Sequence, residues 1–198
     1  MNALQIAASG MVAQQHNAEV VANNLANMNT SGYQRRRTEF NDLLYNAMPR
    51  KDSVSSKAGE VVPAGVQQGL GVRIAAIYRI SEQGNLQATD NAFDLAIQGR
   101  GYFQVLLPNG DVAYTRNGTF QLNGAGQLVT HDGFSLQPGI LIPPGAIDVT
   151  INASGEVLAK QDGVQQLANV GTVQVTTFPN EAGLRAIGDN LFRETQAS

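Results

Sequence analysis

The sequence predicts a mainly β protein with an α appendage, in which a long N-terminal helix precedes an antiparallel β body. One observation is a helical hydrophobic repeat that spans residues 4–28. Another is a series of short β-rich runs, separated by Asn-Gly and Asp-Gly dipeptides, beyond residue 72. The third is 21 glycines in 198 residues, above the usual share of about 7%, which indicates many tight turns.

The N-terminal helix carries apolar residues at a seven-residue spacing, which is typical of a coiled-coil seam. Its two lines are Leu4, Met11, Ala18 and Leu25, and Ala7, Gln14, Val21 and Met28. Glu19 is the only charged residue among the first 34, so no charge opposes close packing on several sides. A 25-residue helix is roughly 37 Å long, so we expect part of it to pack on another helix. The alternative is an amphipathic helix lying across its own sheet.

The segment after the helix changes character. Residues 29–32 should end the helix, with Gly32 in a left-handed conformation. Three arginines at 35–37 form either a solvated turn or a site for acidic groups or phosphates, including the acidic residues of a neighbouring subunit. The spacing of Phe40, Leu43 and Leu44 favours a second, short helix over residues 38–45.

Composition then divides the chain into three parts. Residues 1–45 form a helical assembly segment, residues 46–71 are rich in Pro, Gly, Ser, Lys and Gln and read as an extended linker, and residues 72–198 form the β body. The predicted strands are 72–80, 93–98, 102–107, 112–115, 119–122, 127–130, 134–137, 147–151, 156–159 and 172–178. Tight hairpin turns are expected at Asn109-Gly110, Asn117-Gly118, Asn123-Gly124, Asp132-Gly133 and Asp162-Gly163.

Composition also excludes several function classes. A formal net charge of −3 provides no positive electrostatic field that would attract the phosphates of nucleic acid. The absence of cysteine rules out disulfides and thiolate metal sites. The sequence contains no run of 18 or more apolar residues, so no membrane span is predicted. The N-terminus lacks the positively charged region of a cleaved signal peptide.

The sequence offers no catalytic, cofactor-binding or metal-binding constellation. Gly99-Arg100-Gly101 lacks the third glycine and following helix of a dinucleotide site, so it reads as a tight strand connection. His16 reads as a polar face residue of the helix and His131 as a turn residue. Asp90 and Asp94 could form a carboxylate pair on a short helix, although Asp90 is more simply a helix cap.

Particular residues resemble the N-terminal signature of bacterial flagellar rod and hook proteins. They are residues 21–27 (VANNLAN) and 29–33 (NTSGY), and the likeness continues through residues 40–45, 83–86, 94–103, 114–120 and 126–130. Within the family, residues 46–64 and 67–73 resemble the distal-rod members most. The proximal rod and hook members share the helix signature and are the nearest alternatives.

The resemblance implies a structural subunit, not an enzyme, that polymerises into the helical drive shaft of the basal body. Its partners would be copies of itself, other rod and hook subunits and the flagellar export apparatus, which would carry it to the periplasmic rod without a cleaved signal. The family ends in a second heptad helix, whereas this sequence ends where the β body should lead into it. The implied assembly interface comprises Leu4, Ala7, Met11, Ala18, Val21, Asn23, Asn24, Leu25, Ala26, Asn27 and Met28.

Two other function classes stay open from the residues alone. A secreted β-domain that binds carbohydrate or peptidoglycan would use exposed aromatic rings, for which five tyrosines but no tryptophan are available. A hydrolase would rest on Asp90 and Asp94 alone.

Overall fold

The computed structural model describes residues 2–47, 67–161 and 166–198. The chain forms two compact units. The helical unit comprises Met1–Asn27 and Arg35–Ile80, and the β unit comprises Met28–Gln34 and Ser81–Ser198. One N-terminal helix and several antiparallel sheets confirm the predicted fold class.

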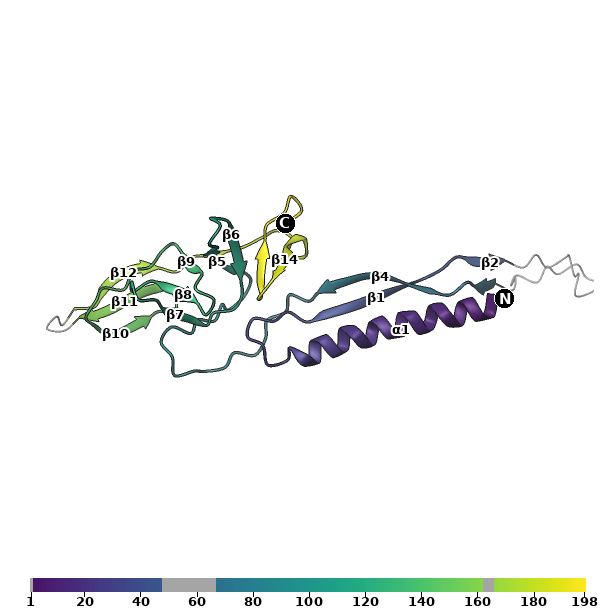
Figure 1. Ribbon diagram of the computed structural model, residues 1–198, viewed down its shortest axis with the longest axis horizontal. Helices are drawn as coiled ribbons and strands as arrows, with labels where there is room; N and C mark the ends of the chain where they lie inside the picture. The colour runs from purple at the N-terminus through teal and green to yellow at the C-terminus, as the bar shows by residue number, and fades with distance from the viewer. Residues whose placement is uncertain (1, 48–66, 162–165) are drawn as a thin grey trace, which may run out of the picture. The chain divides into compact units, whose positions relative to one another are not determined.

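The helical unit is built on a helix and a two-stranded ladder. Helix α1 (Asn2–Ala26) runs beside strands β1 (Arg36–Asp42) and β4 (Val72–Arg79), which pair antiparallel (Figure 1). Gly32, in the connection that follows the helix, has φ 71°, as predicted. A two-stranded ladder is marginal by itself in water, so the helix is what gives this ladder a covered face.

The predicted second helix at residues 38–45 is wrong, because β1 and β2 (Tyr45–Ala47) occupy this segment. Thr38 is buried and Phe40 half-buried, while the residues that alternate with them, Arg37, Glu39 and Asn41, are exposed. This alternation has the period of two that a strand requires. Pairing with β4 decides the conformation, and a local reading of residues 38–45 alone could not detect it.

The predicted linker begins and ends in paired strands. β2 pairs antiparallel with β3 (Gln67–Gly69), so both ends of the segment 46–71 belong to a ladder instead of an irregular connection. Residues 48–66 lie outside the described part of the chain. The proposed boundary at residue 72 also differs from the division between units, which falls after Ile80 because β4 pairs with β1.

The β unit contains an eight-stranded and a three-stranded sheet. The larger has the order β14-β15-β6-β5-β9-β8-β7, with β13 also paired to β5, and the smaller has the order β10-β11-β12. The strands are β5 (Tyr102–Leu106), β6 (Val112–Thr115), β7 (Phe120–Leu122), β8 (Leu128–Thr130), β9 (Ser135–Gln137), β10 (Ala146–Ile151), β11 (Glu156–Gln161), β12 (Ala168–Thr172), β13 (Val175–Thr176), β14 (Arg185–Gly188) and β15 (Leu191–Arg193). A 3-10 turn, η1 (Glu181–Gly183), precedes β14.

The main core of the β unit is shared by both sheets. Phe103 and Phe120 from the larger sheet join Val149 and Val157 from the smaller in one buried cluster. A second cluster packs Tyr102, Tyr114, Phe178 and Phe192 edge to face, with ring centroids 4.7–5.9 Å apart. Such geometry matches the aromatic quadrupole preference, and it fixes Tyr102 firmly in the larger sheet.

Most predicted strands are confirmed, with local corrections. Residues 93–98 form only an isolated bridge between Asp94 and Thr119, because Gly118 lies against the backbone of Leu95 and its carbonyl accepts from the Leu95 N–H at 2.8 Å. Strands β12, β14 and β15 were not predicted, and only residues 175–176 of the run 172–178 form β13.

The hairpin turns are partly as predicted. Gly110 and Gly133 have the expected positive φ, of 84° and 86°. Gly118 and Gly124 are not among the positive-φ glycines of the described residues, and the turn after β7 uses Gly126 instead, with φ 80°. Asp162-Gly163 lies outside the described residues.

Candidate assembly surface

Two polar tethers fix the helix to its ladder. The Asn24 side chain donates to the Arg36 carbonyl at 2.8 Å and accepts from the Arg36 N–H at 2.9 Å, at the start of β1. Fifteen residues earlier, Ser9 Oγ accepts from the Val72 N–H at 3.3 Å, at the start of β4. Each tether satisfies backbone groups at a strand end, so the helix is held near both ends.

The face of α1 that meets the ladder consists mainly of small and polar residues. Ala13 is 3% exposed, and Ser9, Gly10, His16 and Asn17 are half-buried beside it. These positions recur every three or four residues, which places them on one side of the helix. Small side chains let the helix approach the strands closely, and Ile6 and Val20 are half-buried on the same side, so this contact uses only part of the helix's apolar surface.

The opposite face presents the predicted seam to solvent. Leu4 is 76% exposed, Met11 68% and Leu25 66%. Ala7, Ala18, Val21, Asn23, Ala26 and Met28 are exposed as well. Apolar side chains normally occupy the covered face of an amphipathic helix, and here a second set of large apolar side chains is left exposed. The helix therefore does lie along its own strands, as the alternative reading held, but the heptad seam remains available.

Two residues of the predicted interface are used within the subunit. Asn24 makes the tether to Arg36, and Asn27 donates to the Asn23 carbonyl at 2.9 Å. Both side chains are half-buried. Ser9 was not singled out from the sequence, because a serine within a helical repeat carries no signal for a contact with a strand 63 residues away.

The remaining candidates from the sequence do not form a catalytic site. No helix contains Asp90 or Asp94, so neither the one-turn spacing nor the helix-cap reading holds, and Asp94 instead accepts from Asn91 at 2.9 Å. His16 lies on the helix surface 3.0 Å from Glu19, and His131 lies in a turn 3.2 Å from Asp132. Among the described residues, no group of three metal-ligating side chains is present.

The arginines at 36–37 lie on a strand, and Gly99 and Gly101 lie in a strand connection. Arg36 and Arg37 are exposed on β1. Gly99 and Gly101 have φ of 101° and 141°, in the connection that enters β5, which agrees with the reading as a tight strand connection. None of the helices within the described ranges is long and apolar enough to cross a membrane.

Two segments of the chain match known protein families. Residues 4–34, which include the seam, match the flagella basal body rod protein family, and residues 96–159 match the D1 domain of the flagellar hook proteins FlgE/F/G. The whole chain is 57% identical to the flagellar basal-body rod protein FlgG of Caulobacter vibrioides and covers 76% of it. The FlgG of Agrobacterium fabrum is 47% identical over the whole chain, again with 76% of that protein covered.

The chain belongs to the FlgG family of flagellar basal-body rod proteins. The hook protein FlgE of Treponema pallidum is 36% identical over 79% of the chain and only 33% of the hook protein, so the likeness to FlgG is the more complete one. The chain is thus a structural subunit of the distal rod, which confirms both the family assigned from the VANNLAN and NTSGY motifs and the distal-rod assignment made from residues 46–64 and 67–73. FlgG membership also leaves no support for the carbohydrate-binding and hydrolase alternatives.

Proposed function

We propose that the exposed seam of α1 is the surface through which this subunit joins the rod, by packing against helices of neighbouring copies and of related rod and hook subunits. In this proposal α1 (Asn2–Ala26) contributes to a helical layer of the rod. The flagellar export apparatus delivers the subunit to the periplasm. The observation that carries the proposal is the outward exposure of Leu4, Met11 and Leu25.

The apolar area of the seam would contribute favourably to association. Leu4, Met11, Val21 and Leu25 each retain more than half of their accessible surface. Complete burial of a large apolar side chain contributes about 1.5–3 kcal/mol. Covering the exposed parts of these four therefore contributes on the order of 4–8 kcal/mol per helix, before the entropy lost on association.

The described residues of the helical unit form no extensive core. All three buried hydrophobic clusters among the described residues lie in the β unit. In the helical unit Ala13 and Thr38 are buried, whereas Leu44, Tyr45 and Ile77 are exposed in addition to the seam. An exposed apolar surface of this kind marks an interaction site, so the unit is suited to being covered by neighbours.

Cysteine cross-linking tests this proposal directly, because the chain contains no cysteine of its own. Ala18→Cys places a thiol on the seam, and Glu19→Cys places one on the adjacent, also exposed position that carries the helix's only charge. In assembled rods, mild oxidation should link Ala18→Cys subunits to one another by disulfides and leave Glu19→Cys subunits without such links. Equal cross-linking of both, or of neither, in motile cells would refute the seam assignment.

A further inference from the structure

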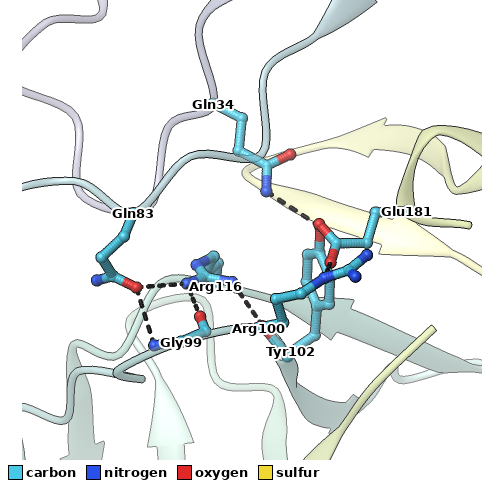
Figure 2. Close-up of polar contacts among 8 residues, drawn as sticks. Gln34, Gln83, Gly99, Arg100, Tyr102, Arg116 and Glu181 are labelled. Carbon is cyan, nitrogen blue, oxygen red and sulfur yellow. Dashed lines mark hydrogen bonds and ion pairs between the residues drawn. The ribbon is translucent and has the colours of Figure 1, made fainter. Parts of the chain in front are cut away.

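The chain passes between the helical unit and the β unit at three places, after Asn27, after Gln34 and after Ile80. Two stretches on the β-unit side, residues 28–34 and the residues that follow Ile80, lack regular strands. A hydrogen bond that Gln34 donates and one that Gln83 accepts nevertheless fix each stretch to the rest of the β unit (Figure 2). We call the residues that make these bonds the crossing clamp: Gln34, Ser81, Gln83, Gly99, Arg100, Gly101, Tyr102, Arg116 and Glu181.

One half of the crossing clamp is organised by Glu181 of η1. Its side chain is 6% exposed and accepts from Arg100 Nε at 2.8 Å, and the Tyr102 hydroxyl donates to its second oxygen at 3.4 Å. Gln34 donates to the same Tyr102 hydroxyl at 3.0 Å. A buried carboxylate with several donors is a rigid acceptor, so the first crossing stretch is tied to it through one aromatic ring.

The other half is organised by Arg116, which follows β6. Its Nη1 donates to the Gly101 carbonyl at 3.1 Å, and its Nη2 donates to Gln83 Oε1 at 2.9 Å and to the Gly99 carbonyl. Gln83 Oε1 also accepts from the Gly99 N–H at 3.1 Å. The planar guanidinium presents its donors in a fixed fork, so a single side chain holds the second crossing stretch against the connection that enters β5.

The charges of the two halves support each other. Burial by itself raises the pKa of Glu181, but hydrogen bonds from Arg100 and Ser81, with the positive charges of Arg100 and Arg116, lower that pKa below its usual value. The carboxylate is therefore ionised at neutral pH. Ser81 is the first residue of the β unit after the third crossing, so Glu181 bears on the crossing at Ser81 as well as on the one at Gln34.

We propose that the crossing clamp fixes two of the three exit points of the chain on the β unit, at Gln34 and at Ser81, so that load passes at these crossings through held connections instead of loose ones. The load-bearing role rests on the proposed assembly into a rod, whereas the fixing of the exit points does not. None of Gln34, Ser81 and Gln83 belongs to a buried hydrophobic cluster of the described residues, so their bonds add little to the core. What these bonds restrain is the path of the chain.

Hydrogen–deuterium exchange of the free chain tests the fixing. Arg116→Lys keeps the charge but loses the fork that spans three acceptors. It should speed amide exchange at least about tenfold in residues 81–101 while leaving β8 and β11 unchanged. The control is Arg193→Lys, which perturbs the exposed Arg193–Asp111 pair of the same unit (2.9 Å) and should leave residues 81–101 unaffected.

A second variant keeps the test decisive if Arg116→Lys misfolds. Tyr102→Phe removes the hydroxyl that joins Gln34 to Glu181 and retains the ring, so exchange should rise in residues 28–34. Unchanged exchange in these stretches, or an equal rise across the whole β unit, would overturn the proposal. Ala18→Cys cross-linking should persist in both variants, so a failed clamp and a failed seam give different results.

Discussion

Placing a charge on the seam should separate assembly from folding most clearly. Leu25 lies in the last turn of α1 and is two-thirds exposed. Full burial of a leucine is worth about 1.5–3 kcal/mol, so Leu25→Asp forfeits on the order of 0.5–1 kcal/mol in the free subunit. An acidic residue near a helix C-terminus adds roughly 0.3–1 kcal/mol of unfavourable dipole interaction. We expect the free helical unit to lose about 1–2 kcal/mol and the β unit none.

The same change should be far more damaging in the rod. There an ionised carboxylate would be desolvated without a partner, and such a group costs several kcal/mol. Because each 1.4 kcal/mol is about tenfold in an equilibrium constant, incorporation should fall by orders of magnitude and motility should be lost. Soft-agar swimming with rod isolation measures incorporation, and circular dichroism of the purified chain measures folding.

Leu25→Asn is the matched control, since it has the shape of Asp without the charge. It should retain partial incorporation, and the difference between the two variants isolates the desolvated charge. Normal swimming of Leu25→Asp would refute the reasoning that this face becomes buried. A large drop in the unfolding midpoint of the β unit would show instead that Leu25 acts through folding.

Other changes test the fold. Gly118→Ala would place a Cβ 1.6 Å from the Leu95 carbonyl oxygen, so we expect a loss above about 3 kcal/mol in urea unfolding; a loss below about 1 kcal/mol would contradict this contact. Ala13→Glu buries a charge beneath the ladder and should weaken the helical dichroism signal of the free chain, which an unaltered spectrum would disprove. The lowered pKa of Glu181 means that its stabilisation is complete above the unfolded value near pH 4.3 and is lost as pH falls through the lower folded value. Glu181→Gln should therefore flatten the pH dependence of stability below about pH 4.3, and identical acid profiles would exclude this role.

The helix was accessible to prediction because heptad spacing is a local property. Leu4, Met11 and Leu25 are exposed, and their role as an interface stays a prediction. The docking face was not recognised, although its apolar residues Ile6, Ala13 and Val20 also lie seven residues apart. Nothing in the spacing alone tells which of the apolar lines packs on the strands.

The β unit was predicted where turn chemistry was explicit. The β14–β15 hairpin was missed because its turn is Asp189-Asn190, both with positive φ (51° and 56°), instead of a dipeptide with glycine. The crossing clamp was beyond local reasoning, because Arg100 and Glu181 are 81 residues apart in the sequence. The sequence around neither residue indicates its partner, and only the folded topology brings the two together.

The two tethers of α1 also determine the angular position of the seam. Ser9 is bound at one strand and Asn24 at the other, about 22 Å apart along the helix axis. A helix held at two points can neither slide nor turn, and the register of β1 on β4 defines where those points lie. A shift of one residue along the helix would rotate the seam by about 100°. The strand ladder therefore sets the direction in which the seam of each subunit faces before the subunit meets a neighbour.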